Sequence, residues 1–343
     1  MVAPITPAAK LADWLQRLWY DTTPWHALLI PLSWLFGLVS RIRRTLYHVD
    51  LLQRQRLAVP VIVVGNISVG GTGKTPLTIW LAQKLAAHGW HPGIISRGYG
   101  GNASAAQAVT AHSNVYITGD EPRLLAQRVN CPVWISRDRP AAGRALLAAH
   151  PETDIIISDD GLQHYALIRD IEIVVVDSAR GFGNARLLPA GPLREPLARL
   201  READAVVLNQ TGARHTGIPT LSNSYMMQLA GNEFVNLKHP EQTAVAADFH
   251  GCDIHAVAAI GHPQRFFDQL DAMGILHTPH AFADHHPYQA SDLNFPGIII
   301  MTEKDAVKCE AFATEQMWVL PIQAQPDPAL LPHILAKLGN QHG

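Results

Sequence analysis

The chain is poor in cysteine and in charged residues, and it has no excess of charge of either sign. Its 343 residues include three cysteines, which lie far apart with no CxxC pair. This spacing excludes a disulfide framework and a zinc knuckle, and it favours a reducing compartment. Charged residues make up 16% of the chain and the net charge is −2. No overall basic field is therefore available to attract nucleic acid, and we expect no nucleic-acid partner.

The chain also lacks an apolar run long enough to cross a membrane as a helix. The run at residues 27–39 is interrupted by Pro31, and a spanning helix needs about 20 apolar residues. A secretory signal is not evident either, because this run begins late and no small-residue cleavage site follows it. Two interpretations remain open: a helix packed on the protein's own core, or a helix lying in the membrane interface.

What the sequence does contain at its start is positive charge and tryptophan. Residues 1–56 carry a net charge of +4 and the remainder carries −6. Four of the eight tryptophans lie in this stretch, and Arg41, Arg43 and Arg44 directly follow the apolar run. Tryptophan at the boundary and arginine facing anionic head groups are typical of a helix on a membrane surface. We refer to residues 1–56 as the N-terminal segment and expect it to belong to the first domain.

After Pro60 the sequence alternates between short Val/Ile-rich runs and helical stretches. The expected strands are Val61–Val64, Gly93–Ser96, Val115–Thr118, Pro132–Ile135, Asp154–Ser158, Ile171–Val176 and Ala205–Leu208. Such runs predict an α/β fold with a mostly parallel sheet covered on both faces. A similar pattern near the end predicts a second, smaller α/β domain. We expect a catalytic domain at 57–222, an extended linker at 223–240 and the smaller domain at 241–343.

The strongest motif lies directly after the first expected strand. It consists of Ser68, Val69, Gly70, Gly71, Thr72, Gly73, Lys74 and Thr75. It matches the phosphate-loop pattern G-x-x-x-x-G-K-S/T at every required position but the first, where serine replaces glycine. Glycines let backbone N–H groups surround phosphates, Lys74 reaches the terminal phosphates, and the Thr75 hydroxyl holds Mg²⁺. The first domain is therefore predicted to be of the P-loop NTPase type.

A carboxylate for the metal is expected at the end of another strand. Asp159 and Asp160 follow an apolar run, where an acid that orients Mg²⁺ would lie. The alternative is ordinary turn chemistry, since Asp-Asp-Gly is also a turn sequence.

A second acidic pair and a histidine complete the set of candidates. Asp120 and Glu121 follow an expected strand, where one carboxylate could accept a hydroxyl proton and the other could hold a metal. The alternative for this pair is a helix start, because proline follows it. His285, in Asp284-His285-His286, could relay a proton for such an acid. A polar histidine-rich loop is the alternative, and a zinc site is disfavoured by the spacing.

Taken together, these motifs resemble those of the tetraacyldisaccharide 4'-kinases of lipid A biosynthesis. The resemblance rests on NISVGGTGKTP, SRGYGG, GDEP, DDGLQH, FGNARLLPAGPLREP, GHPQRFF, Asp284-His285 and TEKDAVK, in this order along the chain. It implies transfer of phosphate from ATP, with Mg²⁺, to the 4'-hydroxyl of a tetraacylated glucosamine disaccharide 1-phosphate, giving lipid IVA. It also implies a peripheral location at the cytoplasmic face of the bacterial inner membrane, and two domains joined by a short β-ribbon.

The resemblance also implies residue roles. Asp120 resembles the catalytic carboxylate, assisted by His285. Glu121 and Asp159 resemble acids on the metal side, together with Thr75. Asn184 and Arg194 resemble substrate-side residues, where a guanidinium could bind the 1-phosphate.

Two departures and two rival functions accompany this interpretation. Ala185 and His262 stand where the family pattern leads us to expect glycine and asparagine. The first rival is a membrane-associated P-loop ATPase of the partitioning or targeting type. Such proteins usually carry lysine before the paired glycines, where this chain has Val69. The second rival, a nucleotide-gated binder of the membrane surface, would not need Asp120 or His285.

Overall fold

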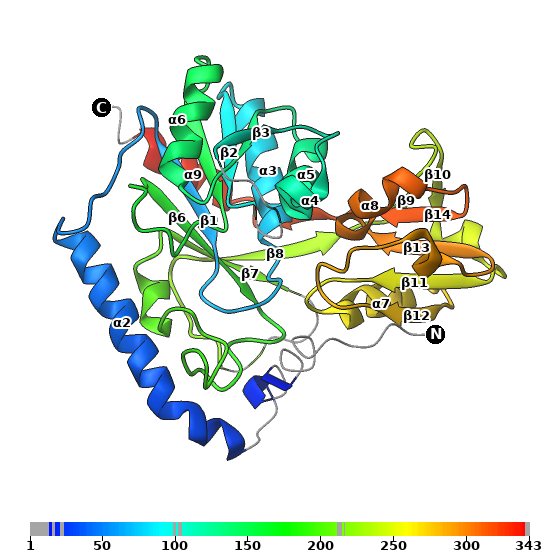
Figure 1. The fold of residues 1–343 in the computed structure, drawn as a ribbon, viewed down its shortest axis with the longest axis horizontal. Helices are drawn as coiled ribbons and strands as arrows, with labels where there is room; N and C mark the ends of the chain where they lie inside the picture. Colours follow the sequence, from blue (N-terminus) through cyan, green and yellow to red (C-terminus); the bar gives the residue numbers. More distant parts are fainter. Residues whose placement is uncertain are drawn as a thin grey trace.

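The computed structural model describes residues 14–15, 18–20, 24–98, 101, 105–210, 215 and 217–339. Lys10 and Arg17 of the N-terminal segment, and Tyr99 and Gly100 of the SRGYGG motif, lie outside the described residues. Two β-sheets lie side by side along the longest axis of the molecule, and a long helix runs along the outer edge of the larger one (Figure 1).

The larger sheet has nine strands among the described residues, in the order β15-β8-β7-β6-β1-β5-β2-β4-β3. Its strands are β1 (Val61–Gly65), β2 (Pro92–Ser96), β3 (Gln107–Val109), β4 (Val133–Ile135), β5 (Ile155–Asp159), β6 (Ile171–Asp177), β7 (Ala205–Asn209), β8 (Ser224–Ala230) and β15 (Gln323–Pro326). The two edge strands, β3 and β15, pair antiparallel, and the strands between them pair parallel. The predicted mostly parallel sheet is therefore confirmed.

Burial explains why these apolar runs form central strands. Every residue of β1, β2, β5 and β7 is buried, because helices and loops cover both faces of the sheet. One face packs against the helices α3 (Lys74–Ala87), α5 (Asp120–Arg128) and α9 (Leu330–Gly339), and the other against α6 (Arg139–Ala149) and η2 (Leu197–Arg201).

The smaller sheet has six strands in the described part of the chain, in the order β10-β9-β14-β13-β11-β12. They are β9 (Glu233–Asn236), β10 (Thr243–Val245), β11 (Ile254–Ala258), β12 (Thr278–Ala281), β13 (Ile298–Thr302) and β14 (Met317–Leu320). The associated helices are η3 (Ala246–Phe249), α7 (Pro263–Ala272), η4 (Ala290–Leu293), α8 (Glu303–Cys309) and η5 (Glu310–Phe312). The strands β12, β11, β13 and β14 are parallel, and β9 and β10 are antiparallel.

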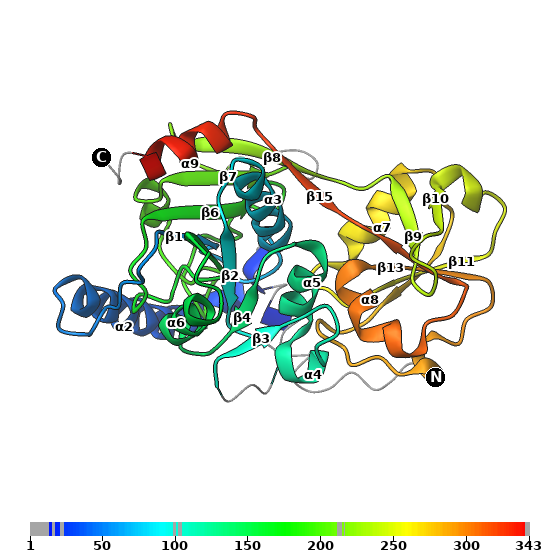
Figure 2. The same cartoon turned by 90° about the horizontal axis from the view of Figure 1, so that it is seen from above.

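The chain crosses between the two sheets twice. It leaves the larger sheet after β8 and returns through β15, which pairs antiparallel with β8 (Figure 2). Residues 323–339, which the sequence analysis grouped with the smaller domain, therefore lie on the larger sheet. Leu330, Ile334 and Leu338 of α9 are buried in the core of that sheet.

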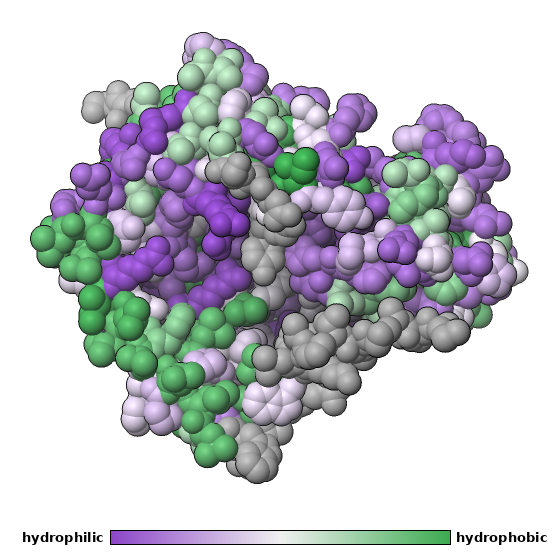
Figure 3. All heavy atoms as spheres, viewed as in Figure 1, coloured by the Kyte–Doolittle hydropathy of each residue, from purple (hydrophilic) through white to green (hydrophobic). Residues whose placement is uncertain are grey.

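The apolar run of the N-terminal segment forms a long helix with an exposed apolar surface. A short 3-10 helix, η1 (Pro24–Leu29), leads into α2 (Ile30–His48), where Pro31 stands in the first turn. Ser33 is buried and donates to Leu187 O at 2.8 Å. We define the apolar face of α2 as Leu28, at the end of η1, together with Leu32, Trp34, Leu35, Leu38, Val39 and Ile42 of α2, each at least half exposed. Figure 3 shows this apolar strip along one side of the larger domain.

No helix in the described ranges combines the length and the apolar character that crossing a membrane would require.

One expected strand is wrong. Residues 115–118 form a short helix, α4 (Val115–Thr118), because the Asn114 side chain accepts a hydrogen bond from Tyr116 N at 2.9 Å and caps the helix start. Asp120 and Glu121 therefore follow a helix and not a strand, and they open α5. The β-branched composition of the run favoured a strand, but the local cap determines the outcome.

Candidate active site

The predicted phosphate loop connects β1 to α3 and is held by neighbouring side chains. Gly73 has a φ of +91°, and a Cβ there would lie 2.7 Å from Asn209 Nδ2. That same nitrogen donates to Thr72 O at 3.0 Å. Asn66 Nδ2 donates to Gly70 O at 3.3 Å on the other side of the loop. The loop conformation therefore depends on glycine at 73 and on two asparagines, Asn66 directly after β1 and Asn209 at the end of β7.

Lys74 and Arg194 share one carboxylate. Lys74 Nζ lies 3.3 Å from Asp160 Oδ1, and Arg194 Nη1 lies 3.6 Å from Asp160 Oδ2. Burial opposes the charge on Asp160, yet these two cations lower its pKa to about 2. Asp160 also has a φ of +48°, an uncommon conformation for a residue with a side chain. The structure thus brings the predicted ATP-binding lysine and the predicted substrate-side arginine to one position.

Asp159 lies one residue earlier, at the end of β5, and is 1% exposed. Its Oδ1 accepts a hydrogen bond from Thr78 Oγ1 of α3 at 3.0 Å. Burial, followed by the negative charges of Glu121 and Asp160, raises the pKa of Asp159 to about 7. Thr75 lies in the first turn of α3, one turn before Thr78. Several carboxylates therefore crowd the helix start that follows the loop.

Arg139 holds the end of β5 through hydrogen bonds from its side chain. Arg139 is 2% exposed, and its guanidinium donates to Asp159 O at 2.6 Å, to Ser158 Oγ at 2.9 Å and to Asp160 O at 3.1 Å. Nothing in the sequence marked this residue, because an arginine at the start of a helix gives no sign of its tertiary partners.

Asp120 and His285 form a direct pair across the two sheets. His285 Nδ1 lies 2.9 Å from Asp120 Oδ2 and 3.2 Å from Oδ1. Because a carboxylate can only accept, the imidazole Nδ1–H is the donor. Burial raises the pKa of Asp120, but the hydrogen bond from His285 and the charge of Lys304 outweigh it and hold this pKa below its usual value.

The same hydrogen bond raises the pKa of His285. His285 has a φ of +60°, so its backbone is held in the left-handed region. Backbone strain of this kind concentrates at functional sites. His286, its neighbour, points elsewhere: its Nε2 lies 3.1 Å from Asp292 Oδ2.

Lys304 completes this group from the start of α8. Its Nζ lies 3.1 Å from Glu121 Oε1, 3.3 Å from Asp284 Oδ1 and 3.4 Å from His285 Nε2. The surrounding carboxylates, Glu121 foremost, overcome the effect of burial and raise the pKa of Lys304. The TEKDAVK motif marked this segment in the sequence, but its position against Glu121 is visible only in the fold.

Asn184 is engaged within its own loop. Its Nδ2 donates to Ala190 O at 2.7 Å, and its Oδ1 accepts from Arg186 N at 3.2 Å. Ala185, which stands where we expected glycine, has a φ of +56°. The described contacts of Asn184 therefore shape the loop that leads to Arg194.

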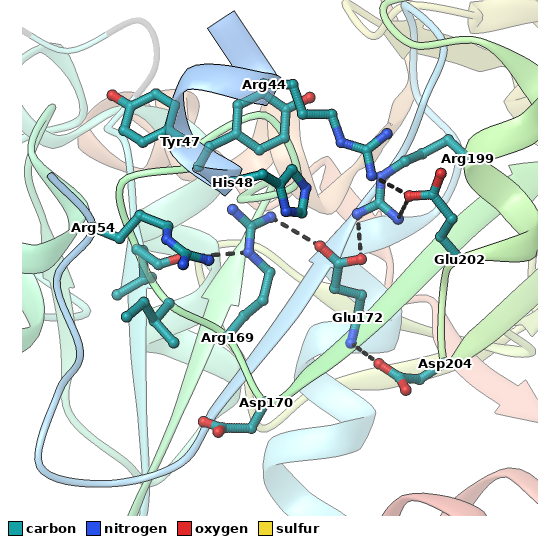
Figure 4. Close-up of a pocket in the computed structure, with 13 residues that line it drawn as sticks. Arg44, Tyr47, His48, Arg54, Arg169, Asp170, Glu172, Arg199, Glu202 and Asp204 are labelled. Atoms are coloured by element: carbon teal, nitrogen blue, oxygen red, sulfur yellow. Dashed lines mark hydrogen bonds and ion pairs between the residues drawn. The ribbon is translucent and has the colours of Figure 1, made fainter. Parts of the chain in front are cut away.

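A separate cavity of about 390 Å³ lies beside the C-terminal end of α2 and contains none of the predicted site residues (Figure 4). It is lined largely by arginine and acidic side chains that pair with one another, as Arg199 does with Glu172 and Arg44 with Glu202.

Within the described residues, no cluster of three or more histidine, cysteine, aspartate or glutamate side chains is arranged to hold a metal ion by protein ligands alone.

The fold and the site define an α/β protein of two mostly parallel sheets, with a glycine-rich loop, a cluster of carboxylates and an acid–histidine pair where the sheets meet. The sequence model of the tetraacyldisaccharide-1-P 4'-kinase family matches residues 25–339, and the chain belongs to this family.

Relatives and a solved structure agree with this assignment. The chain is 50% identical over 331 residues to the tetraacyldisaccharide 4'-kinase of Methylobacillus flagellatus, covering 96% of this chain and 97% of the relative. It is 51% identical over 328 residues to the enzyme of Azoarcus sp., covering 95% of each. The crystal structure of LpxK from Aquifex aeolicus in complex with ATP is similar, with a TM-score of 0.78 and 29% identity, over 91% of this chain and 99% of that one.

Proposed function

We propose that this chain transfers the γ-phosphate of ATP to the 4'-hydroxyl of a tetraacyldisaccharide 1-phosphate, giving lipid IVA and ADP. The observation that carries the proposal is the contact between Asp120 and His285 at 2.9 Å, together with membership of the kinase family. A protein that only changed conformation on binding or hydrolysing nucleotide would not need such a pair.

Asp120 is suited to accept the proton of the acceptor hydroxyl. Its lowered pKa keeps it a carboxylate at neutral pH, so it can take the proton as the hydroxyl oxygen bonds to phosphorus and the bond to the ADP oxygen breaks. His285 orients the carboxylate through its Nδ1–H. Held between Asp120 and Lys304, the imidazole stays in one orientation.

The phosphates of ATP would lie in the loop from Ser68 to Thr75, with Lys74 against the terminal phosphates. Mg²⁺ fits the oxygen ligands nearby, because Asp159, Glu121 and Thr75 supply two carboxylates and a hydroxyl. The raised pKa of Asp159 reflects crowding of negative charge, which a divalent cation relieves. When bound, the ion neutralises charge on the phosphate oxygens.

Arg194 is placed to bind the acceptor. It approaches Asp160 at 3.6 Å without forming a close bidentate pair, so its guanidinium can turn to an anionic group such as the 1-phosphate. Asn184 would act through the loop that carries Arg194.

The apolar face of α2 is proposed to lie on the cytoplasmic surface of the inner membrane, with the protein peripheral. A contiguous exposed apolar strip needs a partner, and a substrate with four acyl chains resides in a bilayer. Arg41 and Arg43 on the same helix would face anionic head groups.

The decisive experiment supplies γ-labelled ATP and the tetraacyl disaccharide 1-phosphate to the purified protein. Label should appear in the lipid and require both Mg²⁺ and the acceptor. Label released only as inorganic phosphate would instead identify an ATPase of the partitioning or targeting type.

A further inference from the structure

The two sheets have separate apolar cores. Two clusters of buried apolar residues belong to the larger sheet and its helices, and two belong to the smaller one. Among the described residues, none of these clusters includes members from both sheets. The relative position of the two halves therefore depends on the chain crossings at β8 and β15 and on polar contacts where the halves meet.

The main polar contact joins α5 to α8. Arg123 of α5 donates from Nη1 to Val307 O at 2.8 Å and pairs with Glu310, directly after α8. Arg128, at the end of α5, pairs with Glu303 at the start of α8. We call Arg123, Arg128, Glu303 and Glu310 the α5–α8 clamp. Figure 2 shows these two helices adjacent at the boundary between the halves.

The clamp holds α8 at both of its ends. Since Arg128 binds the start of the helix and Arg123 binds its end, α8 cannot turn against α5 without breaking one of the two ion pairs. The side chains are shielded, with exposures of 12% and 33% for Arg123 and Glu310 and of 20% and 15% for Arg128 and Glu303. Other ion pairs also cross the boundary: Lys304 with Glu121, His285 with Asp120, and Arg265 of α7 with Asp177.

These two helices also carry the site. Asp120 is the first residue of α5, and Lys304, the second residue of α8, contacts His285. A rotation of α8 relative to α5 would move Lys304 against His285, and through it would act on the contact between Asp120 and His285. Partly exposed ion pairs contribute little net stability, but two of them at separate points fix an orientation.

We propose that the α5–α8 clamp is a positioning device that aligns the Asp120–His285 pair across the two halves of the enzyme. The inference rests on the proposed function, because its effect is measured on phosphate transfer. The clamp residues touch neither reacting group; they act through the pair. A misplacement of about 1 Å at a reacting centre costs roughly 100-fold in rate.

The test is the substitution Glu310→Lys, which places a cation against Arg123. We expect kcat for transfer to the lipid to fall roughly 10- to 100-fold, while KM for ATP stays unchanged because the phosphate loop lies on the other sheet. The matched control is Glu315→Lys, the same charge change in an exposed ion pair with Lys238 on the smaller half. We expect this control to retain the wild-type kcat.

A second measurement separates a positioning effect from general destabilisation: kcat of the double variant that combines Glu310→Lys with His285→Ala. If the clamp acts through the pair, Glu310→Lys lowers kcat strongly in the wild-type background and hardly at all when His285 is already absent. The milder Glu310→Gln, which keeps the side-chain size, should show the same dependence on His285 with a smaller loss.

The outcomes separate the two proposals. The clamp is not a positioning device if each substitution, Glu310→Lys or Glu310→Gln, lowers kcat by the same factor with His285 present and with His285→Ala. It is likewise disproved if Glu310→Lys leaves kcat unchanged. A wild-type enzyme that places no label in the lipid overturns the proposed function instead.

Discussion

Nδ1 of His285 lies 2.9 Å from Oδ2 of Asp120, although 165 positions separate the two residues along the chain. Asp120 opens α5 beside the larger sheet, and His285 lies in a loop of the smaller sheet, after β12. The acid–histidine pair therefore exists only when both halves are folded and correctly oriented.

Asp120→Asn should strongly reduce the rate of transfer while sparing nucleotide binding. The amide keeps the size of the side chain but cannot take up the hydroxyl proton, so we expect kcat to fall about 10²- to 10⁴-fold. Calorimetric titration with ATP and Mg²⁺ should give the wild-type affinity. Asp268→Asn on α7, an exposed position, serves as the control. A wild-type transfer rate in Asp120→Asn would remove Asp120 from the mechanism.

Gly73→Ala should damage the phosphate loop, whereas Gly71→Ala should leave the nucleotide-free fold intact. A Cβ at 73 combines a φ of +91° with a 2.7 Å approach to Asn209, while a Cβ at 71 meets nothing within 4 Å. The positive φ alone costs roughly 1–2 kcal/mol. Thermal unfolding without nucleotide checks this: a midpoint lowered by Gly73→Ala but not by Gly71→Ala is expected. Equal midpoints would contradict the described loop.

Replacing Leu28, Leu32 and Leu35 together with glutamine should release the protein from membranes. Each leucine contributes about 1.5–3 kcal/mol when fully transferred out of water. Partial immersion of three should therefore weaken binding by about 100-fold or more. Flotation with vesicles containing anionic lipid measures the effect, and Leu276→Gln, an 88% exposed position on the smaller half, is the control. A triple variant that still floats with vesicles would disprove the membrane role of this face.

Acid should destabilise the protein partly through His164. Burial, together with the positive charge of Arg139, lowers the pKa of His164 to about 4. At pH values between about 4 and the ordinary histidine pKa of about 6.5, this histidine is protonated in the unfolded chain but not in the folded chain. The free energy of unfolding should therefore fall as pH drops from about 6.5 to about 4. His164→Gln should show a shallower fall in denaturant titrations across this range, and parallel curves would contradict the assignment.

The central strands and the loop could be predicted from sequence because their signals are local. Val61–Val64 and Ala205–Leu208 differ from β1 and β7 by a single residue at the end, since continuous Val/Ile runs occur where both faces of a strand are buried. The run at 115–118 is also rich in β-branched residues but is partly exposed, and the Asn114 cap makes it helical. The strand β8, which lies in the predicted linker at 223–240, and the edge strand β15 were missed as strands of the larger sheet because their mixed polar sequences carry no such pattern.

The site could be predicted only where a motif marks it. The pairing of His285 rather than His286 with Asp120 depends on loop geometry, as the left-handed backbone at His285 illustrates. The bridging role of Asp160 and the position of Lys304 against Glu121 depend on which elements meet across the fold. Contacts of this kind, between residues far apart in the sequence, cannot be deduced from spacing along the chain.

The return of the chain to the larger sheet bears on the order in which the protein is made. β15 pairs with β8 at the edge of that sheet, and α9 fills its core beside α3, the helix that begins at Lys74. A ribosome synthesises these residues after those of the smaller half. The half that carries the predicted phosphate loop thus cannot finish packing until the smaller half has been synthesised, and a nascent chain truncated before residue 323 would expose an open sheet edge.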